Sequence, residues 1–137
     1  MRLIFKLILL PFTILMWLFG TSHAANYNEN YFNKLIAKEL NGKVEVRTRL
    51  NRRVDILTKD TAWECDWSYK AWSEGVGQAL TYAELTGKKP GICVLIDSKK
   101  ENADHIALVK MIAKKHKIKL VFYLCNKSNG KMKKVTR

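Results

Sequence analysis

The chain has 137 residues, of which 47% are hydrophobic and 27% are charged, and 25 Lys and Arg against 12 Asp and Glu give a net charge of +13. This length predicts one domain, and the composition excludes a disordered chain and a collagen-like repeat. Three cysteines are too few for a disulfide scaffold. The sequence therefore indicates a small, basic, globular domain.

Residues 1–24 have the pattern of a secretory signal peptide. Two basic residues precede an uncharged segment, 7–20, and the small residues Ser22 and Ala24 stand three and one positions before a cleavage site. An uncleaved anchor is the alternative, but the apolar run is shorter than the about 20 residues that span a bilayer, and Pro11 interrupts it. We therefore expect a periplasmic or secreted protein without a membrane span, anchored only if this segment is not cleaved.

The excess positive charge lies near the C-terminus. Residues 25–97 hold 11 basic and 10 acidic side chains, whereas residues 98–137 hold 12 basic and 2 acidic ones. Such asymmetry indicates a polyanionic partner, either nucleic acid or an anionic membrane or cell surface. The alternative is a solvated basic helix face and tail that keep the protein soluble.

Hydrophobic periodicity predicts a helix, three strands, a helix, a strand, a helix and a strand. The expected elements are a helix that begins at Asn28 or Asn30 and ends before 41–42, strands over 44–50, 53–58 and 62–67, a helix over 70–86, a strand over 91–96, a helix over 102–116 and a strand over 120–125. The first three strands form an antiparallel meander, and the last two a parallel crossover. We therefore expect an α/β domain over 25–125 with a mixed sheet flanked by helices, and a basic tail over 126–137.

The second and third strands bring carboxylates together. A two-residue turn at 59–60 places Asp55 opposite Glu64, with Asp66 on the same face. Opposed carboxylates repel, so solvent, the guanidinium of Arg53 or a divalent cation must offset the repulsion. Oxygen ligands of this kind suit Mg²⁺ or Mn²⁺. The alternative is a solvated strand face with an Arg53–Asp66 ion pair and no metal.

The helix after this hairpin carries a polar stripe. Lys70, Glu74, Gln78 and Tyr82 follow one another at intervals of four residues, beside the apolar positions that pack on the sheet. The first helix also contains Glu39, a further candidate to approach a metal. The three cysteines fall in different strands, which excludes a paired zinc motif and favours buried free thiols over a single disulfide.

These motifs resemble those of the PD-(D/E)XK, or restriction-endonuclease-like, nuclease superfamily. Asp55, nine residues before Glu64-Cys65-Asp66, is similar to its paired acidic motif, and Gln78 with Tyr82 is similar to the Q-x-x-x-Y motif of its recombination-exonuclease branch. The resemblance covers about residues 35–125. It implies a restriction-endonuclease-like αβββαβ core, followed by one more helix and strand.

The resemblance implies a metal-dependent nuclease that hydrolyses phosphodiester bonds of nucleic acid, with DNA the expected substrate. Asp55 and Glu64 would hold Mg²⁺ or Mn²⁺, with the backbone carbonyl of Cys65 a further ligand. The basic C-terminal helix and tail would engage phosphates. The alternatives are a catalytically inactive relative that binds nucleic acid, another polyanion or a protein, and a basic surface-binding protein whose acidic hairpin has no function.

One position departs from the superfamily's pattern. Asp66 stands where the usual motif has a lysine, and Lys70, near the start of the next helix, is the candidate replacement. Lys70 would stabilise developing charge or orient water, whereas Asp66 would join the metal site or hold Lys70. Gln78 and Tyr82 would position the substrate strand. The alternative for Lys70 is an ordinary exposed lysine.

Overall fold

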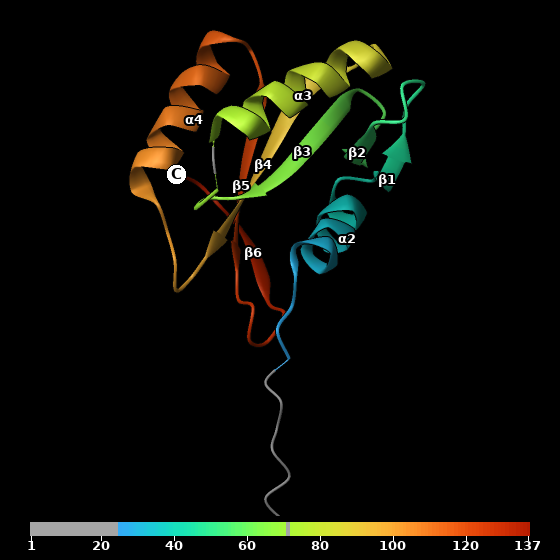
Figure 1. The fold of residues 1–137 in the computed structure, drawn as a ribbon. Helices are drawn as coiled ribbons and strands as arrows, with labels where there is room; N and C mark the ends of the chain where they lie inside the picture. The colour runs from blue at the N-terminus through green and yellow to red at the C-terminus, as the bar shows by residue number, and fades with distance from the viewer. Residues whose placement is uncertain (1–24, 71) are drawn as a thin grey trace, which may run out of the picture.

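Three helices and a six-stranded mixed sheet form an α/β fold (Figure 1). This computed structural model describes residues 25–70 and 72–137, so the predicted leader over 1–24 lies outside the described residues. The elements are α2 (Glu29–Glu39), β1 (Lys43–Arg47), β2 (Arg53–Leu57), β3 (Thr61–Trp67), α3 (Trp72–Thr86), β4 (Lys89–Asp97), α4 (Ala103–Lys115), β5 (Lys119–Cys125) and β6 (Met132–Val135). No helix in the described part is long and apolar enough to cross a membrane.

The strands lie in the sheet in the order of the sequence, from β1 to β6. β1, β2 and β3 form the predicted antiparallel meander, and β4 and β5 the predicted parallel pair. β3 and β4 are also parallel, so α3 and α4 are the crossover connections that the two parallel pairs need. The predicted order of elements is confirmed as far as β5.

The side chains of β4 show which helices cover each face of the sheet. Its odd-numbered residues Cys93 and Leu95 belong to the core cluster that contains Phe32 and Ile36 of α2. Its even-numbered residues, such as Val94, belong to the cluster formed with α3 and α4. Successive side chains of a strand point to opposite faces, so α2 covers one face and α3 and α4 the other (Figure 1).

The hairpin between β2 and β3 has the predicted register. The paired residues are Ile56 with Trp63 and Leu57 with Ala62. The backbone N–H of Thr58 donates to the carbonyl of Thr61 at 2.9 Å, which closes the two-residue turn. Continued by two positions from Leu57, this register brings Asp55 across from Glu64.

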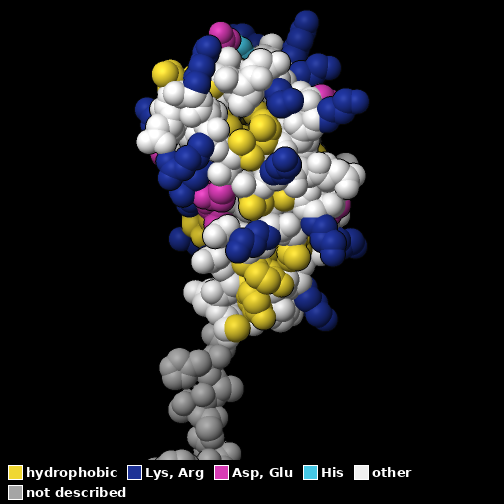
Figure 2. All heavy atoms as spheres, turned by 90° about the vertical axis from the view of Figure 1, so that its right-hand side faces the viewer, with side chains coloured by type: hydrophobic (Ala, Val, Ile, Leu, Met, Phe, Trp, Pro, Cys, Tyr) yellow, Lys and Arg dark blue, Asp and Glu magenta, His cyan; other side chains and the backbone are white. Residues whose placement is uncertain are grey.

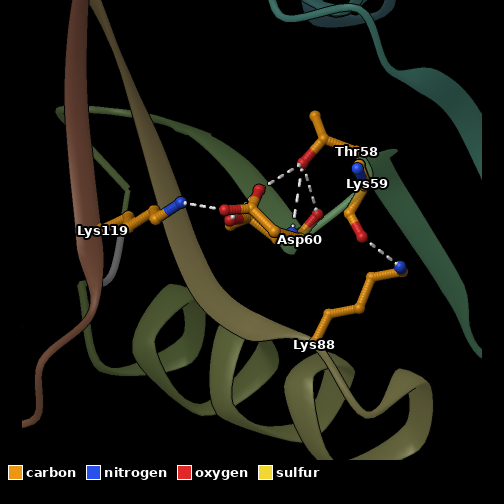
Figure 3. A network of polar contacts seen from close by, with 6 residues as sticks. Thr58, Lys59, Asp60, Lys88 and Lys119 are labelled. Atoms are coloured by element: carbon orange, nitrogen blue, oxygen red, sulfur yellow. Dashed lines mark hydrogen bonds and ion pairs between the residues drawn. The ribbon is translucent and has the colours of Figure 1, made fainter.

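Polar contacts anchor this turn to distant parts of the chain (Figure 3). Asp60 forms an ion pair with Lys119 of β5 at 2.7 Å, and this contact lowers the pKa of Asp60 to about 2. Lys88, after α3, donates to the carbonyl of Lys59 at 2.6 Å. The turn is therefore tied to β5 and to the segment after α3 by exposed contacts.

Two segments differ from the prediction. Strand β1 ends at Arg47 instead of continuing to Leu50, because the chain turns there: the N–H of Thr48 donates to the carbonyl of Arg52, and Asn51 adopts a left-handed φ of 56°. Leu50 is consequently 67% exposed. The predicted tail over 126–137 contains a strand, β6, which pairs with the edge of β5.

The three cysteines Cys65, Cys93 and Cys125 are free and buried, as predicted. Cys65 and Cys93 lie opposite each other on β3 and β4, and both belong to the core cluster against α2. Burial raises the pKa of the Cys65 thiol, which therefore stays protonated and acts as a small apolar side chain.

Positive charge is not confined to the C-terminal elements. Figure 2 shows the side of the molecule that carries α2 and β1, with Lys and Arg side chains spread over the whole of it and hydrophobic side chains between them. The sequence alone, with its balanced counts before residue 98, does not indicate this spread.

Substitution of Gly91 by Ala should destabilise the fold. A Cβ at Gly91 would lie 2.4 Å from Cε3 of Trp63 and 2.7 Å from Cγ2 of Thr61. Overpacking of this kind costs about 1–3 kcal/mol. Gly77→Ala is the matched control, because a Cβ there meets nothing within 4 Å and alanine favours the helix by about 0.5–1 kcal/mol. Urea unfolding should show a lower free energy of unfolding for Gly91→Ala and a higher one for Gly77→Ala, each relative to wild type. An equal change in both variants would contradict the packing at Gly91.

Candidate functional site

A polar pocket lies where β2 and β3 meet α3 and the start of α2. Its volume is about 480 Å³. The residues that line it are Glu29, Arg47, Asn51, Arg52, Arg53, Asp55, Glu64, Asp66, Lys70, Glu74, Gln78 and Tyr82. The pocket therefore brings together every side chain that the sequence assigned to catalysis or substrate binding.

One buried and one half-buried carboxyl group share this pocket. The hairpin places Asp55 of β2 across from Glu64 of β3, and Asp55 accepts a hydrogen bond from the backbone N–H of Cys65 at 2.8 Å. Glu64 is only 6% exposed, and among the described residues its Oε2 has no hydrogen-bond partner. A buried polar atom without a partner costs about 1–3 kcal/mol. Glu64 lines the pocket, so a cation bound there would supply the missing partner.

The environment of this pair opposes its negative charge. Burial raises the pKa of Glu64 far above its usual range, and the charge of Asp55 raises it further. Burial also raises the pKa of Asp55, although the hydrogen bond from Cys65 lowers it in part. The pair therefore retains a proton near neutral pH in the absence of another cation.

The donor set suits a hard divalent cation. Asp55 and Glu64 offer carboxylate oxygens, and Mg²⁺ is commonly held by one or two carboxylates together with water and substrate phosphate. Within residues 25–70 and 72–137, no three His, Cys, Asp or Glu side chains form a complete metal-binding group. A cation bound here would therefore take its remaining ligands from water or substrate.

Lys70 contacts two carboxylates at the pocket. A lysine that replaces the usual motif lysine must lie close to the acidic residues in this way. Its Nζ lies 3.0 Å from Oδ1 of Asp66 on β3 and 2.9 Å from Oε2 of Glu29 on α2. Burial lowers the pKa of Lys70, but the two carboxylates raise it more, so the ammonium stays charged. Asp66 also accepts a hydrogen bond from the N–H of Trp67, which fixes its carboxylate.

The predicted polar stripe on α3 faces the pocket. Glu74, Gln78 and Tyr82 all line it, one helical turn apart. Tyr82 is only 8% exposed and packs on Val54 and Ala62, while burial raises its pKa, so its hydroxyl stays protonated. The stripe therefore forms one wall of the pocket.

Two expectations for the site differ from the structure. Arg53 forms its ion pair with Glu45, at 2.8 Å, instead of with Asp66. The acidic residue that α2 contributes is Glu29, whereas Glu39 accepts a hydrogen bond from the hydroxyl of Tyr123. The second difference arises because the start of α2, not its end, lies beside the pocket, whereas Arg53 pairs with Glu45 of the neighbouring strand β1.

Cys65 meets the site only through its backbone. Its thiol is buried in the core cluster on the α2 face, and its N–H binds Asp55. The predicted ligand role of its carbonyl stays a prediction.

The cations at the pocket come from an unexpected part of the chain. Arg47, Arg52 and Arg53 line it from β1, β2 and the turn between them. No residue of 98–137 lines it in the part of the chain that the structure describes, although the sequence places the candidate phosphate-binding surface there. In the sequence, the only sign of arginines at the pocket is the alternation of Arg with apolar residues over 44–50, and this pattern fits any half-exposed strand.

The acidic pair should make the metal-free protein less stable as the pH rises. The pKa of Glu64 is higher in the folded than in the unfolded chain, so its contribution is complete below the unfolded pKa and is lost as the pH rises through the folded pKa. Urea unfolding in EDTA should show a free energy of unfolding that falls from about pH 5 upwards. Glu64→Gln should flatten this dependence of the free energy of unfolding on pH. An unchanged dependence would show that a group other than Glu64 causes it.

Comparison with known proteins gives one distant relative to consider. The chain is 38% identical over 99 residues to a protein of Acanthamoeba polyphaga mimivirus that is named a KilA-N domain-containing protein. The match covers 72% of this chain but 26% of the viral protein, so the chain spans about a quarter of that protein's length. No family model and no solved structure matches the chain.

Proposed function

We propose that this protein is an exported, metal-dependent nuclease of the PD-(D/E)XK type, which hydrolyses phosphodiester bonds of nucleic acid, with DNA the expected substrate. The observation that carries the proposal is the pair formed by half-buried Asp55 and buried Glu64, which shares a pocket with the ammonium of Lys70. The order α2, β1, β2, β3, α3, β4 supports it, because the superfamily core has this order.

The acidic pair would hold Mg²⁺ or Mn²⁺, with the Cys65 carbonyl as a further ligand. When bound, such an ion polarises a phosphoryl oxygen and lowers the pKa of coordinated water. Asp55 is oriented by the Cys65 N–H, and Oε2 of Glu64 has no hydrogen-bond partner among the described residues. Both carboxylates are thus available to the cation.

Lys70 would supply positive charge where negative charge develops in the reaction. Its two ion pairs hold the ammonium beside the acidic face, so Asp66 and Glu29 act as positioning residues. Gln78 and Tyr82 would bind the substrate strand from the wall that α3 forms.

One observation favours a second function, which is binding without cleavage. Asp66 occupies the position of the usual motif lysine, and Lys70 is already paired with two carboxylates. If these pairs do not yield to substrate, the protein binds nucleic acid, another polyanion or a protein on the same fold.

Cleavage assays separate the two functions. The protein is incubated with labelled single- and double-stranded DNA and RNA, with Mg²⁺ or with EDTA. We expect cleavage with Mg²⁺, none with EDTA, and none by Asp55→Asn, whose amide oxygen can still accept from Cys65. Binding by wild type without cleavage of any substrate would sink the nuclease proposal and support the second function.

A further inference from the structure

The pocket carries opposite charges on its two sides. Asp55, Glu64 and Asp66 come from the β2–β3 hairpin, while Arg47 and Arg52 come from β1 and the turn before β2. A ligand that fills this pocket must therefore offer an oxygen to a cation on the acidic side and a separate anion to the arginines.

The turn before β2 presents these arginines in a defined way. Asn51 adopts a left-handed φ of 56°, which asparagine tolerates better than most residues, and its side-chain oxygen accepts a hydrogen bond from Nη1 of Arg47. This contact orients the guanidinium without neutralising it. The turn is closed by the hydrogen bond from Thr48 to the carbonyl of Arg52, at 2.8 Å.

The arginines differ in the charge that they can offer. Arg53 is paired with Glu45, so most of its charge is compensated. Arg47 donates a hydrogen bond to the neutral Asn51, and neither Arg47 nor Arg52 has an ion pair among the described residues. Two uncompensated guanidinium groups on one wall match the geometry of phosphate oxygens.

We infer that Arg47 and Arg52 form a clamp for the phosphate next to the scissile one, which makes the site selective for a polynucleotide over a single phosphodiester. This inference rests on the proposed function, because it assigns the acidic side to the scissile phosphate. It gives the substrate two points of attachment, with the flanking phosphate on the arginine wall and the scissile phosphate beside Asp55 and Glu64.

Binding without cleavage tests the clamp first. Anisotropy of a labelled single-stranded DNA oligonucleotide is measured in EDTA for wild type and for Arg47→Gln/Arg52→Gln. Two lost phosphate contacts should lower the slope of log K against log salt by about 1.4 and weaken binding by about tenfold at low salt. The matched control is Lys43→Gln/Arg49→Gln, which removes two exposed charges of the same hairpin that do not line the pocket.

A small substrate tests where the arginines act. Bis(p-nitrophenyl) phosphate has one phosphodiester and no flanking phosphate, so the Arg47/Arg52 variant should cleave it within about twofold of wild type while losing activity on the oligonucleotide. The clamp is overturned if the Arg47/Arg52 variant loses equal activity on both substrates, or if it binds the oligonucleotide as well as the Lys43/Arg49 control does. It is also overturned if the wild-type protein does not bind the oligonucleotide. If wild type binds but cleaves neither substrate, the proposed function fails, and the anisotropy comparison alone decides whether the arginines bind phosphate.

Discussion

Replacing Glu64 by Gln should abolish Mg²⁺-dependent cleavage and, without metal, should make the protein more stable. Glutamine has the same shape as the protonated carboxyl group that burial favours at this position. It also removes the cost of protonation, because Glu64 ionises in the unfolded chain near neutral pH but keeps its proton beside Asp55 in the folded one. A substitution that increases stability and removes activity is the signature of a residue retained for function.

The loss of cleavage should exceed about 100-fold, the upper range for groups that only support a metal ligand. Thermal unfolding should show a higher melting temperature for Glu64→Gln than for wild type in EDTA, and an increase on adding Mg²⁺ for wild type alone. Glu101→Gln is the control, since Glu101 is a half-exposed partner of Arg137 outside the pocket. A Glu64→Gln protein that is less stable in EDTA and still cleaves would show that the pair is structural.

Replacing Lys70 by Gln should lower kcat by about 10²- to 10³-fold, the effect of removing one group that stabilises the transition state. KM and oligonucleotide binding should change little, because Arg47 and Arg52 still hold the substrate. Lys70→Arg should recover part of kcat, since it restores the charge but not the shape of the ammonium.

Lys119→Gln is the matched control for Lys70→Gln. Lys119 also forms an ion pair, with Asp60, and its side chain is 43% exposed against 49% for Lys70, but it does not line the pocket. Its loss should leave kcat within about twofold of wild type. If Lys70→Gln behaved like Lys119→Gln, Lys70 would be an ordinary exposed lysine with no part in cleavage.

The parts of the site within one hairpin and one helix were predictable from the sequence. A two-residue turn at 59–60 allows one register, and that register places Asp55 opposite Glu64. The four-residue spacing of Glu74, Gln78 and Tyr82 places these side chains on one side of α3 for the same local reason, whereas Lys70 precedes the helix. Both predictions needed only the geometry of a single element.

The contributions from distant elements were not predictable in this way. Glu29 meets Lys70 across 41 positions of the chain, because α2 packs under the opposite face of the sheet with its first turn beside the pocket. Arg47 and Arg52 enter the site because β1 ends early and the chain turns at Asn51. Strand β6 is short and largely charged, so its pairing with β5, and not its own pattern, makes it a strand.

The central claim is that Asp55 and Glu64 are held together in order to bind a divalent cation. The most direct test is a titration of the metal-free protein with Mn²⁺, in which the free ion is followed by electron paramagnetic resonance. We predict one bound Mn²⁺ per chain that Mg²⁺ displaces, with binding lost in Asp55→Asn and in Glu64→Gln but kept in Glu101→Gln. Binding that survives both substitutions, or no binding by wild type, would contradict the claim.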